Sequence, residues 1–127
     1  MITIELTDEY AYGEPPPSFI WRGKPYDYIK LIKDLYFLGE QNGNLIQLSN
    51  LNYIDTKELN ILLCSNNNAN ILNKIEGLNV SINLDANLWR EIIEYFLSIS
   101  FSPAHNYIDF DEYNLYEDAN FIISSEG

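Results

Sequence analysis

The chain has 127 residues, of which 46% are hydrophobic and 14% aromatic, and its formal net charge is −12. This size and composition exclude a disordered chain and predict a single globular domain over residues 1–127. The sequence has no apolar run of the roughly 20 residues that a membrane span needs, no secretory signal pattern, and a single cysteine, Cys64. Since a lone cysteine fits a reducing compartment, we expect a cytoplasmic protein.

Hydrophobic periodicity predicts both strands and helices. Alternation of apolar and polar residues, as in residues 2–6 and 78–84, is typical of half-buried strands. Apolar residues spaced by three and four, as in residues 86–98 behind the capping residue Asp85, are typical of a helix. The expected elements are strands over residues 2–6, 19–22, 45–48, 78–84, 107–111 and 119–124, and helices over residues 25–38, 56–64, 69–75 and 86–98.

Three of the expected helix boundaries depend on local signals. Gly39 is expected to end the first helix, and Gly77 the third. Asp55 and Glu58 resemble a capping box and are expected to begin the second. Because these elements do not follow a regular βαβ alternation, the predicted fold class is α+β. We expect a small mixed or antiparallel sheet packed against three to four helices.

The excess negative charge lies at the two ends of the chain. Residues 22–90 contain all seven basic side chains and seven acidic ones, so this stretch is formally neutral. Residues 1–21 contain four acids and residues 91–127 contain eight, and neither end has a basic side chain. If the two ends meet in the fold, as chain termini often do, these acids would form one negative face able to steer a basic partner.

Residue patterns that would indicate catalysis or metal binding are sparse. A nucleophilic dyad would have to join Cys64 to His105, the single histidine, and Cys64 ends an apolar run that is typical of a buried structural thiol. The acids over residues 109–118 lack the spacing of a calcium-binding loop, and there is no glycine-rich phosphate loop. We therefore predict no enzyme activity, no metal and no cofactor. Scarce Lys and Arg also argue against direct nucleic-acid binding.

Tyrosines beside acids suggest a recognition surface. The chain has ten tyrosines, a residue type enriched at interface hot spots, and neighbouring carboxylates can accept paired hydrogen bonds from arginine. Tyr28, Tyr36 and Tyr95 lie on predicted helices and are expected to pack in the core instead. The predicted partner-binding residues are, first, Asp109, Asp111, Glu112, Tyr113, Tyr116, Glu117 and Asp118, and, second, Glu5, Asp8, Glu9 and Glu14.

In these features the whole chain resembles the immunity proteins of bacterial toxin systems, particularly those of contact-dependent growth inhibition. The resemblance is one of size, composition and charge, so it carries over no site residue. It implies a protein that binds and neutralises a cognate toxin with a basic surface, frequently a nuclease, without contacting nucleic acid or membrane itself. Two alternatives remain: a DNA mimic that inhibits a DNA-binding or DNA-cleaving protein, and a small enzyme centred on His105.

Overall fold

A computed structural model describes residues 1–110 and 113–126. In this part of the chain the residues form two five-stranded sheets, two α-helices and a short 3-10 helix over Leu48–Asn50, which confirms the α+β class. The elements in chain order are β1 (Ile2–Thr7), β2 (Ser18–Arg22), α1 (Asp27–Glu40), β3 (Leu45–Gln47), β4 (Ile54–Asp55), β5 (Asn60–Ser65), β6 (Asn70–Glu76), β7 (Asn79–Leu84), α2 (Ala86–Ser100), β8 (His105–Tyr107), β9 (Tyr116–Glu117) and β10 (Asn120–Ser124).

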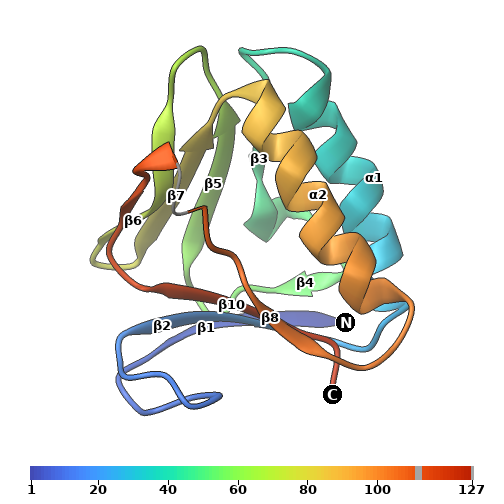
Figure 1. Ribbon diagram of the computed structural model, residues 1–127, viewed down its shortest axis with the longest axis vertical. Coiled ribbons are helices and arrows are strands. Elements are labelled where there is room, and N and C mark those ends of the chain that lie inside the picture. The colour runs from blue at the N-terminus through green and yellow to red at the C-terminus, as the bar shows by residue number, and fades with distance from the viewer. Residues whose placement is uncertain (111–112, 127) are drawn as a thin grey trace.

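The first sheet, here called the terminal sheet, joins the two ends of the chain. Its strand order is β4-β1-β2-β10-β8. The first two strands pair antiparallel, with Glu5 opposite Ile20, whereas β10 runs parallel to β2, with Ile122 opposite Ile20. The first and last strands are therefore separated by one strand only, across the bottom of the molecule in Figure 1.

The second sheet, here called the central sheet, has the order β3-β5-β7-β6-β9 and is also mixed. Helices α1 and α2 lie side by side over one of its faces (Figure 1). Alternate residues of β5 and β7, such as Ile61, Leu63, Val80 and Ile82, are buried against the helices. One continuous apolar core joins both sheets and both helices, with Trp21, Phe19 and Phe121 of the terminal sheet among its largest members.

The sequence prediction is wrong over residues 56–76, where strands β5 and β6 replace two expected helices. Asp55 does not cap a helix: its Oδ1 accepts a hydrogen bond from the Lys57 N–H at 3.0 Å. Lys57 and Glu58 have φ values of 52° and 71°, which turn the backbone left-handed and cannot begin an α-helix. Gly77, with φ 62°, lies in the turn between β6 and β7 rather than at a helix end.

The described residues therefore contain two α-helices instead of three to four. Helix α1 also continues through Gly39 to Glu40, so the prediction that Gly39 ends it is wrong. Gly39 faces α2, where a Cβ would lie 3.0 Å from Cγ of Arg90, and the Arg90 Nε–H donates to the Gly39 carbonyl at 2.7 Å. The absence of a side chain at Gly39 allows α1 and α2 to pack closely, and it does not mark the end of the helix.

Other predicted elements agree with the structure to within one or two residues: β1, β2, β3, β7, α2 and β10. The strand expected over residues 107–111 is displaced, because β8 spans His105–Tyr107. Ile108 and Phe110 are buried, as their alternation predicts. Asp111 lies outside the described residues.

Candidate functional site

Helix α2 presents a polar stripe beside its buried face. Asp85 caps the helix, since its Oδ1 accepts a hydrogen bond from the Leu88 N–H at 2.9 Å. The helix buries its apolar side against both sheets, including Ile92 and Phe96. The adjoining stripe repeats at positions i, i+3, i+4 and i+7, a spacing that aligns side chains along a helix; its members are Glu91, Glu94, Tyr95 and Ser98.

Strand β8 and the residues that follow it form the opposite wall of a groove. The Tyr95 hydroxyl donates to the Asp109 carbonyl oxygen at 2.8 Å, and the Asn106 side-chain amide donates to Ser98 Oγ at 2.8 Å. The rings of Tyr95 and Phe110 meet edge to face at 5.4 Å. The groove between the two walls has a volume of ≈ 490 Å³, and its lining residues are Glu91, Glu94, Tyr95, Ser98, Asn106, Tyr107, Asp109 and Phe110. We call it the α2 groove.

Two polar atoms in this lining are shielded from solvent and lack a hydrogen-bond partner among the described residues. One is Oε2 of Glu91 and the other is the Tyr107 hydroxyl oxygen. The other carboxylate oxygen of Glu91 accepts from the Tyr113 hydroxyl at 3.2 Å, so the side chain is held in place. Buried polar atoms without partners are uncommon and each costs roughly 1–3 kcal/mol. The lining of the α2 groove therefore contains two hydrogen-bonding atoms that are not satisfied by the described residues.

A smaller hollow of ≈ 170 Å³ extends the α2 groove past Asp109 and Phe110 to Asn114 and Glu117. Asp118 lies beyond this hollow, and its carboxylate is engaged by neighbouring groups of the same chain. The Asp118 carboxylate accepts from the Tyr116 hydroxyl at 2.6 Å and from the Ile75 N–H at 2.7 Å. These two hydrogen bonds lower the pKa of Asp118, the tyrosine bond being the larger cause, and the same bond raises the pKa of Tyr116.

The structure brings together only part of the first predicted set. Asp109 lines the α2 groove, Tyr113 contacts Glu91 at its rim, and Glu117 lines the adjoining hollow. Tyr116 and Asp118 form their own pair next to β6. The remaining two members, Asp111 and Glu112, lie outside the described residues.

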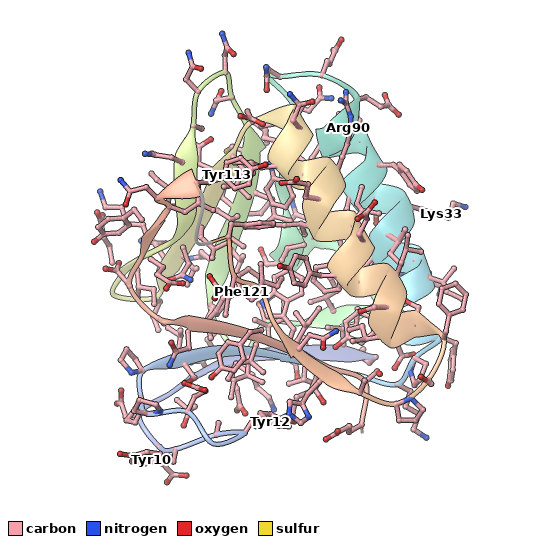
Figure 2. All side chains as sticks on the ribbon, viewed as in Figure 1. Tyr10, Tyr12, Lys33, Arg90, Tyr113 and Phe121 are labelled. Carbon is pink, nitrogen blue, oxygen red and sulfur yellow. The ribbon has the colours of Figure 1, made fainter. Side chains whose placement is uncertain are left out.

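The second predicted set does not join this site. Glu5 forms an ion pair with Arg22 across β1 and β2. Asp8 and Glu9 are exposed, and Glu14 half-buried, in the loop between those strands. Figure 2 shows Tyr10 and Tyr12 of this loop at the bottom of the molecule, far from Tyr113. The chain ends meet in the terminal sheet, but the acids of the 8–14 loop do not line the α2 groove.

Sequence reasoning missed Glu91, Glu94 and Tyr107 as site residues and placed Tyr95 in the core. The body of Tyr95 does pack against Phe110, but its hydroxyl reaches the rim of the α2 groove. The spacing of the polar stripe on α2 could have been recognised in the sequence. The opposite wall of the groove could not, because it depends on how residues 105–110 pack against the helix.

His105 and Cys64 are not brought together. Nδ1 of His105 lies 3.0 Å from a carboxylate oxygen of Glu126, and its ring stacks 4.7 Å from that of Tyr12. Cys64 belongs to β5 in the central sheet, where burial raises the pKa of its thiol. Within residues 1–110 and 113–126, no group of three or more His, Cys, Asp or Glu side chains is arranged to hold a metal ion.

Comparison of the chain with protein-family models, curated proteins and solved structures finds no match. Neither of the helices in the described part of the chain has the length and apolar character to cross a membrane. The geometry of the α2 groove is thus the main guide to function.

Proposed function

We propose that this chain is a protein-binding module that neutralises a basic protein, in the manner of toxin immunity proteins, by binding a basic segment of its partner in the α2 groove. One observation carries the proposal: Glu91, Glu94 and Asp109 line the same groove as the phenol rings of Tyr95 and Tyr107. Carboxylates beside aromatic rings are the chemical complement of an arginine or lysine side chain.

The carboxylates in the groove favour arginine over lysine. A guanidinium group offers five N–H donors in a plane and can donate two parallel hydrogen bonds to one carboxylate, and its flat face can stack on the ring of Tyr95 or Tyr107. An ammonium group offers neither the paired geometry nor the flat face. We therefore expect arginine to bind more tightly than lysine in the α2 groove.

The compact shape of the site supports the immunity proposal over the DNA-mimic alternative. A mimic needs acids spaced like phosphates along an extended surface, whereas the groove and the adjoining hollow gather four acids in one place: Glu91, Glu94, Asp109 and Glu117. The acids of the 8–14 loop belong to a different surface. The enzyme alternative receives little support, since His105 lies outside the lining of the groove.

Capture of the partner tests the proposal. The tagged protein would be incubated with native lysate at low salt, and bound proteins would be identified by mass spectrometry. We expect a basic protein that elutes at high salt, is toxic when expressed alone, and is neutralised by co-expression of this chain. A DNA-processing enzyme that is not toxic would instead support the mimic.

Two variants of equal charge locate the interface. The groove variant combines Glu91→Gln, Glu94→Gln and Asp109→Asn, and the loop variant combines Asp8→Asn, Glu9→Gln and Glu14→Gln. Each removes three negative charges, so general electrostatic attraction changes equally. We expect the groove variant to lose capture and toxin neutralisation while the loop variant retains both. Equal capture by the two variants would contradict the assignment of the groove.

A further inference from the structure

Helix α1 exposes large apolar side chains along the side that faces away from the core. The exposed fractions of Tyr26, Ile29, Tyr36 and Phe37 are 68%, 54%, 53% and 44%. Their spacing places them along one arc of the helix together with three exposed charged residues, because positions three and four apart share a helix face. We call this arc the outer face of α1; its members are Tyr26, Ile29, Lys30, Lys33, Tyr36, Phe37 and Glu40. Large apolar side chains exposed together on one helix face are typical of an interaction site.

The charges on the outer face are ordered along the helix. Lys30 and Lys33 lie in its first half, and Glu40 is its last residue. The ion pairs among the described residues include none of these three, and the Lys30 ammonium lies 5.9 Å above the ring of Tyr53. Two lysines and one glutamate give this face a small positive charge, in a chain whose net charge is −12.

We propose that the outer face of α1 binds a second copy of this chain, as a two-fold symmetric dimer with antiparallel α1 helices. With the symmetry axis at the level of Leu35, position 30 lies opposite position 40 of the second copy, and position 33 opposite position 37. Lys30 then pairs with Glu40 of the second copy, and Lys33 lies over the ring of its Phe37. Because of the two-fold symmetry, each of these contacts occurs twice in the dimer.

Charge complementarity argues for this occupant. Because the lysines lie in the first half of α1 and the glutamate is its last residue, the outer face is complementary to itself when two copies run antiparallel. This face also lacks excess negative charge, so the repulsion between two acidic chains is least where they meet through it. Lys33 points away from the side of the molecule that carries Tyr113 (Figure 2), so a dimer formed here leaves both α2 grooves open.

The inference is independent of what the α2 groove binds, and sedimentation equilibrium of the purified chain tests it. At about 100 µM we expect twice the monomer mass of 14.8 kDa. Ile29→Glu is expected to give the monomer mass, because it buries a charge in the contact. A wild-type chain that stays monomeric at this concentration, or a dimer that persists with Ile29→Glu, would overturn the inference.

A charge exchange tests the proposed antiparallel register. Lys30→Glu and Glu40→Lys are each expected to weaken self-association roughly tenfold, because each places like charges opposite one another. An equimolar mixture of the two variants should recover the dimer, as opposite charges then face each other at both positions. Since both substitutions are exposed, circular dichroism should show unchanged folding. Failure of the mixture to associate would exclude this register.

Discussion

Asn73 shows how one side chain fixes the C-terminal segment to the central sheet. The residue is 0% exposed, and all of its side-chain hydrogen bonds join β6 to residues 118–119. Its Nδ2 donates to the Ala119 carbonyl at 3.0 Å, while its Oδ1 accepts from the N–H groups of Asp118 and Ala119 at 3.0 and 2.9 Å. An amide is needed here, because it both donates and accepts.

Replacing Asn73 should therefore be costly. We expect Asn73→Leu to lower the free energy of unfolding by on the order of 2–4 kcal/mol, since it removes the side-chain partners of the buried Ala119 N–H and C=O groups. Urea denaturation would measure the change. Asn60→Ala is the matched control, because the Asn60 amide only bonds the exposed side chain of Asn79, at 3.2 Å. Its effect should stay within about 0.5 kcal/mol, and equal losses for the two variants would contradict this role of Asn73.

Asp118 gives the fold a defined acid sensitivity. Hydrogen bonds from the Tyr116 hydroxyl and the Ile75 N–H hold its pKa below the ordinary value of about 3.9. Its contribution is thus complete above the unfolded pKa and is lost as the pH falls through the lower, folded value. We expect Asp118→Asn to be less stable than the wild type at pH 7. The difference should shrink toward pH 2 in thermal unfolding followed by circular dichroism. A constant difference across that range would count against a charged Asp118 in the folded state.

The N-cap of α2 fixes where the helix begins. The polar stripe that lines the groove starts about two turns later, so the cap helps to hold the stripe in place. Asp85→Ala removes the hydrogen bond to the Leu88 N–H and should cost about 1 kcal/mol. Asp55→Ala is the comparison, since Asp55 was expected from the sequence to cap a helix and instead bonds the Lys57 N–H within a turn. Chemical denaturation of both variants should show the larger loss for Asp85. A larger loss for Asp55 would contradict the observed turn.

Elements with a regular apolar period could be predicted from the sequence. Helix α2 and strand β7 follow their periods of 3.6 and two residues closely, and their boundaries agree with the structure. Strands β5 and β6, within residues 60–76, could not be predicted, because short apolar segments fit a helix or a strand equally well. The register of β6 also shifts between Ile71 and Lys74, which interrupts the alternation that would have identified it.

Only part of the candidate site could be predicted from the sequence, because the rest depends on tertiary contacts. Asp109 and Tyr113 were found because acids and tyrosines are adjacent in the sequence there. The apolar period of α2 leaves Glu91 and Glu94 on the polar side of the helix, and the helix alone determines no more than that. They become site residues only when Tyr107 and Asp109 pack opposite them, and that contact is tertiary.

The acids near the two chain ends do not merge into one negative face: one group lies around the α2 groove and another in the 8–14 loop. The ion pairs within residues 1–110 and 113–126 engage five acids, Glu5, Asp27, Asp55, Glu76 and Glu126, whereas the chain has 19 acids and a net charge of −12. Self-repulsion of this kind destabilises a compact fold and is screened by salt.

Added salt should therefore stabilise the protein. We expect the Tm to rise by a few degrees between about 20 and 300 mM NaCl, because added salt shortens the Debye length and screens the repulsion among the acids. The groove and loop variants, each with three fewer negative charges, should show a smaller rise. Differential scanning calorimetry would measure it. A Tm that falls with salt would indicate that attractive ion pairs dominate instead.

The most direct test of the α2 groove is a nuclear magnetic resonance titration of the ¹⁵N-labelled chain with N-acetyl-argininamide. We expect saturable amide shifts concentrated in residues 91–98 and 105–110, absent with N-acetyl-glutaminamide and lost in the groove variant. Shifts that centre on the 8–14 loop, or that do not distinguish the arginine derivative from the neutral one, would contradict the assignment of this groove as the site for a basic partner.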